Sequence, residues 1–443
     1  YVRQFGEIVA QEARAVGIQW NWFPYADVNS NPVNPIINTR SFGEDPQEVS
    51  RMVTAYIEGA HKYGMLTTAK HFPGHGDTSI DSHLAVPQIA SDTDHLNRIE
   101  LPPFEAAIKA GVDTIMVGHI VVPALDPDPN HVATISPAIV TGVLKQRLGF
   151  KGLVVTDALD MNGLTKLFPP GAAGAAQAAV QALQAGNDVL LLPSDLDGAY
   201  NGVLQAVHSG VIPESRIDES VIKILRLKAS LGLHKARLVN VEKVNQIVAR
   251  PENVAKGQQI ADSAVTLIRD NHKVLPFRRS PKGTNPSPFT YGNVVETTNK
   301  TVVLIFTDDT RLESGRIFDG QIRARIPEAH VFYIDPRNAI GLTQPVMEAV
   351  QQAERVVAAV YAIPVAGRVA AAGNAAGPTV ADSASAVLLN WCFSQPPTAP
   401  LSPPWETPIW HRRFRVCRTI SARTQTYRFP RLAQSKRYLE RFR

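Results

Sequence analysis

Cysteine is scarce in this 443-residue chain, and long hydrophobic stretches are absent. The two cysteines, Cys392 and Cys417, both lie near the C-terminus, so no disulfide framework holds the bulk of the fold. No segment approaches the roughly 18 uncharged apolar residues of a membrane-spanning helix. Residues 1–17 read as an amphipathic helix and not as a signal peptide. These features argue against a membrane span and leave cytoplasmic, periplasmic and secreted locations open.

Positive charge is concentrated at one end of the chain. Residues 391–443 contain eleven Lys and Arg against two Glu, although the whole chain carries a formal net charge of only +5. Residues 1–390 therefore carry about −4. A mildly acidic body gives little support to nucleic acid as a partner of the folded part.

Apolar segments alternate with helical patterns over the first half of the chain. Five segments read as buried strands of a parallel sheet: residues 18–28, 65–72, 112–120, 151–159 and 187–193. Polar side chains follow four of them: Asp27, Lys70 with His71, His119, and Asp157. This placement predicts a (β/α)8 TIM-type barrel over residues 1–235, with its chemistry at the carboxyl ends of the strands. Because five strands fall short of eight, we expect the barrel to be incomplete at its N-terminus.

Three further regions follow the predicted barrel. Residues 236–265 read as a helical linker, and residues 266–390 as a smaller α/β sandwich domain. Strands of this smaller unit are predicted at 264–271, 300–309, 330–336 and 355–364, with helices between them. Residues 391–443 form a basic, Pro-rich tail with no sustained period. Two interpretations of this tail are open, a frameshift product and a disordered extension.

Residues 70–87, KHFPGHGDTSIDSHLAVP, contain three histidines, two aspartates and a lysine. Pro73, Gly74 and Gly76 break any helical run, so these groups converge from a loop. In an extended segment Asp81 and His83 face the same side, which lets the Asp81 carboxylate orient the His83 imidazole. A histidine titrates near neutral pH and can serve first as an acid and then as a base.

Asp157 follows the apolar strand of VVTDALDM, where a carboxylate shielded from solvent can attack an electrophilic carbon. A glycosidase needs such a nucleophile together with a group that protonates the leaving oxygen. Asp157 and the pair Asp81 and His83 together fit this requirement. Taken singly, an Asp after a strand or a DSH tripeptide is more often a helix cap or a turn.

Three segments carry a family resemblance: GIQWNWFPYADVNSNPVNPIINTRSFGEDP, TAKHFPGHGDTSIDSHLAVP and GLVVTDALDMNGL. In this order and spacing they resemble glycoside hydrolase family 3, in its β-N-acetylglucosaminidase branch. The similarity extends over roughly residues 10–390. The family's acidic motif of the type DQEGG, which precedes the matching region, has no counterpart here.

The resemblance implies a retaining exo-β-N-acetylglucosaminidase that acts on peptidoglycan-derived or chitin-derived glycans without a cofactor. Asp157 would be the nucleophile, and His83, assisted by Asp81, the acid and base. Arg40, Lys70 and His71 would hydrogen-bond sugar hydroxyls. The resemblance implies a carbohydrate partner and leaves the oligomeric state open.

Four competing functions stay open. A metal hydrolase would use His71, His75, Asp77, Asp81 and His83, but Pro73 and Gly74 exclude the helix that a zinc motif of this spacing needs. A β-glucosidase, a phosphorolytic glycosidase and an inactive carbohydrate-binding paralogue complete the set. For His119 and Asp27 two interpretations are open, a role in the site and a structural role as core histidine and loop cap. Trp20 and Trp22 are interpreted as core residues in preference to sugar-stacking residues.

Overall fold

The computed structural model describes residues 1–32, 34, 36–78, 86–267, 301–307, 313, 315–335, 337–353 and 355–361. It divides into two compact units, and among these residues the division falls between Arg250 and Pro251. Each unit is described by itself. The tail at 391–443 and residues 268–300 lie outside the described residues.

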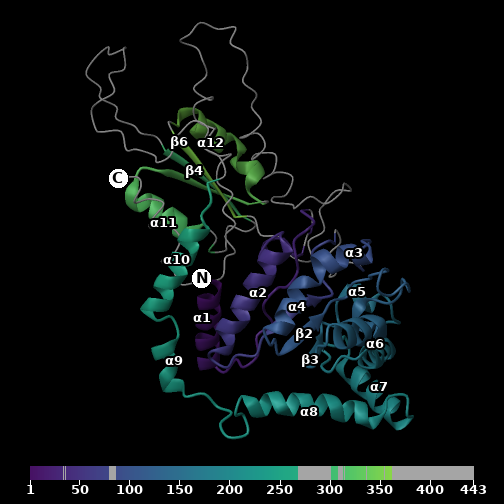
Figure 1. Ribbon diagram of the computed structural model, residues 1–443. Coiled ribbons are helices and arrows are strands. Elements are labelled where there is room, and N and C mark those ends of the chain that lie inside the picture. The colour runs from purple at the N-terminus through teal and green to yellow at the C-terminus, as the bar shows by residue number, and fades with distance from the viewer. Residues whose placement is uncertain are drawn as a thin grey trace, which may run out of the picture. The chain divides into compact units, whose positions relative to one another are not determined.

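The first unit opens with two helices that pack side by side, α1 (Val2–Ala15) and α2 (Pro46–His61) (Figure 1). Their close approach depends on glycine, because a Cβ on Gly59 would overlap the backbone of Arg3. Asp45 caps α2 by accepting hydrogen bonds from the amides of Gln47 and Glu48. Between the two helices, η1 (Asn38–Arg40) is a single 3₁₀ turn.

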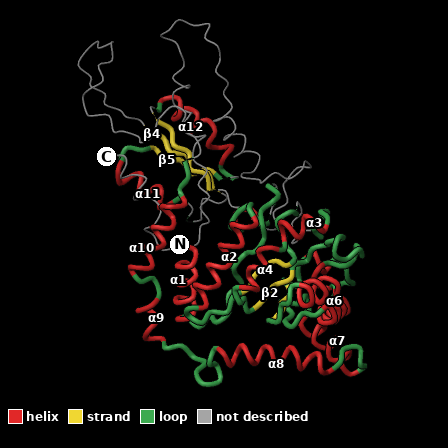
Figure 2. Tube along the Cα trace, in the orientation of Figure 1, coloured by secondary structure: helices red, strands yellow, loops and turns green. Residues whose placement is uncertain are grey.

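A three-stranded parallel sheet forms the centre of this unit (yellow in Figure 2). Its strands, β1 (Thr68–Phe72), β2 (Thr114–Val117) and β3 (Leu153–Thr156), are adjacent in chain order. They confirm the strands predicted within 65–72, 112–120 and 151–159. Such parallel pairing is the pattern expected of successive β–α units.

The strand predicted at 18–28 is replaced by isolated bridges. Trp20 and Tyr25 each make one parallel bridge, to Leu66 and Lys70, and Pro24 between them has no N–H to donate. The Trp22 side chain is 40% exposed, so its interpretation as a core residue is wrong. This segment runs parallel to the sheet without forming a regular strand.

The strand predicted at 187–193 is also reduced to a bridge. Val189 alone bridges to Val155, in parallel. Beside it, the Asp188 carboxylate takes the hydrogen bond of the Val154 amide. The Asp188 side chain thus takes the place of the backbone carbonyl that would accept this hydrogen bond in a continuous β-ladder.

Helices follow the strands along the chain, and several of them pack against one another. α4 (Pro102–Lys109) packs against α2, and α6 (Ala172–Ala185) packs against α7 (Leu196–His208). The remaining helical elements of the unit are α3 (Thr93–His95), η2 (Leu96–Glu100), η3 (Ala133–Ile135), η4 (Ala138–Arg147), α5 (Asn162–Thr165), α8 (Glu214–Ser230) and α9 (Val241–Ile247). None of the helices in the described part of the chain is long and apolar enough to cross a bilayer.

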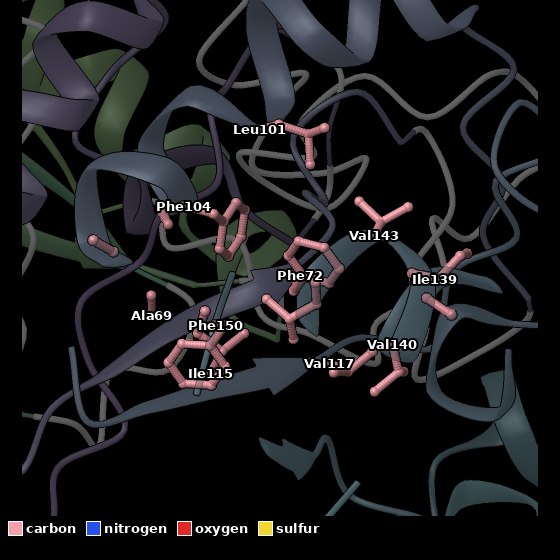
Figure 3. Close-up of a cluster of buried hydrophobic side chains, with 14 of the residues drawn as sticks. Ala69, Phe72, Leu101, Phe104, Ile115, Val117, Ile139, Val140, Val143 and Phe150 are labelled. Atoms are coloured by element: carbon pink, nitrogen blue, oxygen red, sulfur yellow. The ribbon is translucent and has the colours of Figure 1, made fainter. Parts of the chain in front are cut away.

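The core of the first unit lies between the sheet and its helices. Figure 3 shows Phe72 and Ile115 of the strands beside Phe104 of α4 and Val140 of η4. All four side chains are fully buried, and the rings of Phe72 and Phe104 meet edge to face at 5.3 Å. The core fixes β1, which carries Lys70 and His71, and with it the loop that follows β1.

The second unit contains another parallel sheet, in the order β5-β4-β6. β4 (Thr301–Thr307) is completely buried between β5 (His330–Ile334) and β6 (Arg355–Tyr361). Its helices are α10 (Pro251–Ala264), α11 (Arg316–Arg325) and α12 (Ala339–Gln352). These elements confirm the strands predicted at 300–309, 330–336 and 355–364, as far as the described residues extend. The strand predicted at 264–271 does not begin at Ala264, which ends helix α10, and residues 268–271 lie outside the described residues.

Candidate active site

The loop that follows β1 packs closely against Val28 and Asn34. A Cβ on Gly76 would overlap the carbonyl oxygen of Val28, and the side-chain Nδ2 of Asn34 donates to the carbonyl oxygens of His75 and Gly76. The Lys70–His71 and Phe72–Pro73 peptide bonds are cis. The loop thus presents its titratable side chains from a closely packed base.

Asp27 lies under this loop and is completely buried. Its Oδ1 accepts hydrogen bonds from the amides of His71 (3.0 Å) and His75 (2.8 Å), and its Oδ2 pairs with His71 Nδ1 at 2.9 Å. Burial alone would raise the pKa of this carboxyl, but the charge and hydrogen bonds of His71, with the charge of His75, hold that pKa below its usual value. Asp27 therefore remains a carboxylate.

Asp157 follows β3 and faces the same histidine. Its Oδ2 lies 3.7 Å from His71 Nε2, and its Oδ1 accepts a hydrogen bond from the Ala158 amide at 2.9 Å. Burial opposes ionisation, but the positive charges of His71 and His119, the Ala158 amide and Lys70 together lower the pKa of Asp157. The side chain keeps 18% of its surface exposed, so an ionised carboxylate is accessible here.

His119 follows β2 and is buried. Its Nε2 donates to the Ala158 carbonyl oxygen at 2.8 Å, and its Nδ1 meets the Thr134 hydroxyl at 2.7 Å. Burial lowers the pKa of His119, which favours the neutral ring. The contact with Ala158 ties the end of β2 to the peptide directly after Asp157.

The cationic side chains of Arg40 and Lys70 both contact Tyr25. Arg40 donates to the Tyr25 hydroxyl from Nε (2.9 Å) and Nη2 (2.6 Å), and Lys70 Nζ lies 4.8 Å from the ring centroid. The His71 ring lies 5.7 Å from the same phenol. The structure therefore brings Arg40, Lys70, His71 and Asp157 into one site. Asp81 and His83 lie outside the described residues.

Comparison with known proteins identifies the family. The glycosyl hydrolase family 3 N-terminal domain matches residues 1–227. The chain belongs to glycosyl hydrolase family 3. This confirms the resemblance carried by the three sequence segments.

Individual family 3 relatives extend the match into the second half of the chain. Over 290 residues the chain is 36% identical to a "Beta-N-acetylglucosaminidase/beta-glucosidase" of Cellulomonas fimi, which covers 63% of this chain and 50% of that protein. A solved family 3 β-N-acetylglucosaminidase from Paenibacillus sp. str. FPU-7 matches with a TM-score of 0.69 and 30% identity, covering 81% of this chain and 65% of that one. The solved β-glucoside phosphorylase BglX matches with a TM-score of 0.69 and 26% identity, covering 83% and 64%. The chain spans about half the length of the curated relatives that it matches.

A metal centre finds no support in the part of this family 3 chain that the structure describes, where no group of three or more His, Cys, Asp or Glu side chains is arranged to hold a metal ion. Two of the ligands that a metal hydrolase would use, Asp81 and His83, lie outside the described residues. The Nδ1 atoms of His71 and His75 are already engaged, by Asp27 and by the Thr78 hydroxyl.

Glu100, at the end of η2, is a buried carboxyl group that the sequence pattern does not reveal. It packs against the loop so closely that a Cβ on Gly74 would lie 2.8 Å from the Glu100 Cβ. Its Oε1 lies 3.4 Å from Ser30 Oγ and 3.8 Å from His95 Nε2, while Oε2 has no hydrogen-bond partner among the described residues. Burial raises the pKa of Glu100 to about 7, although its interaction with His95 lowers that pKa.

The substitution Glu100→Gln is expected to change how stability depends on pH. A carboxyl whose pKa is about 7 in the fold, against an ordinary value of 4.5, stabilises the fold below pH 4.5, and this contribution is lost as the pH rises through about 7. The melting temperature of the unsubstituted protein should therefore fall relative to that of Glu100→Gln between about pH 5 and pH 8. The difference corresponds to at most about 3 kcal/mol. Parallel melting temperatures across this range would contradict the raised pKa.

Proposed function

We propose that this family 3 chain acts as a retaining exo-β-N-acetylglucosaminidase on peptidoglycan-derived or chitin-derived glycans. The observation that carries the proposal is the ionised, accessible Asp157 carboxylate at the end of β3, facing His71 beside Lys70 and Arg40. The names of the Cellulomonas fimi and Paenibacillus relatives support N-acetylglucosamine as the sugar.

The proposed reaction has two steps. In the first, Asp157 attacks the anomeric carbon, the glycosidic C–O bond breaks, and His83, oriented by Asp81, donates a proton to the departing oxygen. In the second, His83 removes a proton from water, whose oxygen attacks the anomeric carbon and releases Asp157. Arg40, Lys70 and His71 would hydrogen-bond the sugar hydroxyls, because their N–H groups are donors.

The same proposal includes the finer architecture. We place a (β/α)8 barrel at residues 1–235, a helical linker at 236–265 and an α/β sandwich domain at 266–390. The support for a barrel is that the segments at Trp20 to Tyr25, β1, β2, β3 and Val189 make parallel contacts in chain order. Asp157, Lys70 and His71 then lie where a barrel carries its chemistry.

Hydrolysis of a chromogenic aryl N-acetyl-β-glucosaminide tests the proposal. The first sugar product should be the β anomer, detected by proton NMR before it mutarotates, because two displacements at one carbon retain configuration. Initial formation of the α anomer, or no turnover of any N-acetylglucosaminide, would overturn it.

Phosphorolysis is a second candidate, because the phosphorylase BglX shares the fold with the same TM-score as the Paenibacillus enzyme. A histidine acid/base also avoids the repulsion that a carboxylate would exert on incoming phosphate. Phosphorolysis predicts a rate that depends on phosphate concentration and a sugar 1-phosphate as the product. A phosphate-independent rate with free sugar as the product would favour hydrolysis.

The acid role of His83 predicts a dependence on the leaving group. His83→Ala should slow cleavage of a natural disaccharide by about 100-fold or more, since general acid catalysis contributes about that much. A dinitrophenyl glycoside, whose leaving group needs no proton, should lose far less. His131→Ala, which removes a histidine from a separate loop, serves as the control. Equal losses on both substrates would show that His83 is not the acid.

A further inference from the structure

Asp27 has no part in the proposed reaction, yet it is completely enclosed beneath the loop of the site. Its side chain is completely buried, and its two oxygens accept three hydrogen bonds from His71 and His75. A loop cap would need only the two bonds from the amides. The third bond, to His71 Nδ1, connects Asp27 to a side chain that faces Asp157.

His71 lies between two carboxylates. Its Nδ1 is 2.9 Å from Asp27 Oδ2 and its Nε2 is 3.7 Å from Asp157 Oδ2. Because carboxylate oxygens only accept, Nδ1 must carry a proton to bond Asp27. A neutral ring would then turn an unprotonated Nε2 toward Asp157, which is unfavourable. The arrangement is favourable at both ends when each nitrogen carries a proton.

We propose that Asp27 is a positioning residue that holds a second proton on His71, and that through His71 it keeps the Asp157 carboxylate ionised. The inference rests on the proposed role of Asp157 as the nucleophile. A protonated carboxyl lacks the negative charge that makes a carboxylate nucleophilic, so this control would act directly on reactivity.

The direction in which the pKa of Asp157 changes when Asp27 is neutralised distinguishes this coupling from direct charge repulsion between the two carboxylates. If Asp27 were only a second negative charge near Asp157, its neutralisation would make Asp157 easier to ionise and would lower the pKa of Asp157. If Asp27 acts through His71, its neutralisation removes the partner of the Nδ1 proton. The ring then becomes neutral, and the pKa of Asp157 rises.

Other charged groups face the same atoms and stay in place in the variant. Asp157 is also influenced by His119 and Lys70, and Asp27 by His75 and Glu100. Burial lowers the pKa values of His119 and His75, and Asp27→Asn leaves both rings in place.

The test is Asp27→Asn, which preserves size and lets the new amide donate to His71 Nδ1. The carboxyl carbon of Asp157 is followed by ¹³C NMR across the pH range, and its resonance is assigned by its loss in Asp157→Asn. The titration midpoint of Asp157 is expected to move to higher pH than in the unsubstituted protein. An unchanged or lower midpoint would overturn the proposal. Asp45→Asn, at the exposed N-cap of α2, is the matched control and should leave the midpoint unchanged.

A double-mutant cycle tests the route through His71. His71→Gln alone should also raise the Asp157 midpoint, and this variant keeps the proposal testable if Asp27→Asn does not fold. In the His71→Gln background, Asp27→Asn should cause no further rise, because the connecting residue is absent. A further rise of the same size would show that Asp27 acts by another route.

The NMR measurement requires no turnover, so it separates this inference from the proposed function. With an active preparation, the acidic limb of the kcat/KM profile of Asp27→Asn should move to higher pH in step with the NMR midpoint. An NMR shift without any glycosidase activity would retain the coupling and reject the proposed function. Glycosidase activity without the NMR shift would retain the proposed function and reject the coupling.

Discussion

Asp157→Asn is expected to reduce turnover of an aryl N-acetyl-β-glucosaminide by at least about 1,000-fold, equivalent to about 4 kcal/mol of transition-state stabilisation. The amide has nearly the same shape as the carboxylate and can still accept from the Ala158 amide. It lacks the anion that attacks carbon, so the loss should appear in kcat. The measurement is steady-state kinetics at a pH where the unsubstituted protein is most active.

Trapping of the glycosyl intermediate provides a second measurement for this variant. A slowly turned-over 2-fluoro glycoside should add its sugar mass to the unsubstituted protein and none to Asp157→Asn. Asp160→Asn is the matched control, because Asp160 is an exposed carboxylate in the same loop. An adduct of equal yield on Asp157→Asn would assign the nucleophile to another residue.

Gly76→Ala is expected to destabilise the first unit by about 3 kcal/mol or more, at the upper end of what overpacking costs. The added Cβ would overlap the Val28 carbonyl oxygen and lie 2.5 Å from its carbon. Both partners are backbone, so no side chain can rotate away. The loop and the segment at Val28 would have to separate, which would also disturb the three hydrogen bonds of Asp27.

Urea unfolding measures this effect as a lower midpoint at an unchanged slope. The control is Gly142→Ala in η4, where the nearest atom to the new Cβ would be the Pro137 carbonyl oxygen at 3.8 Å. Alanine there should be neutral or slightly stabilising, since it favours helix more than glycine does. Equal midpoints for Gly76→Ala and the unsubstituted protein would show that the loop can shift without loss of stability.

The strands are predictable from the sequence where backbone groups alone form the hydrogen bonds of the β-ladder. β2 and β3 are short, largely apolar runs buried on both faces, and this pattern is visible in sequence, whereas β1 carries Lys70 and His71 within a mostly buried strand. The segments at 18–28 and 187–193 have the same apolar character. Pro24 interrupts the first segment and the Asp188 side chain interrupts the second. Neither effect can be recognised from the number of apolar residues.

The chemical groups of the site are predictable from the sequence, but the buried residues that hold them in place are less so. Motifs identify Arg40, Lys70, His71 and Asp157, and the structure brings them together. At Asp27 the sequence leaves a loop cap and a site residue both open, because in sequence a cap and a buried ion-pair partner look alike. For Glu100, the one available signal is its place between the apolar residues Ile99 and Leu101.

Two buried groups beneath the loop respond to acid in opposite directions. Glu100 binds a proton more tightly in the fold than its ordinary pKa of 4.5 implies, whereas burial lowers the pKa of His75 from 6.5 to about 4. Between about pH 4.5 and 6.5, acidification therefore strengthens the fold at Glu100 and weakens it at His75. The two slopes offset each other, so this part of the molecule is buffered against mild acid although each group alone is strongly pH-sensitive.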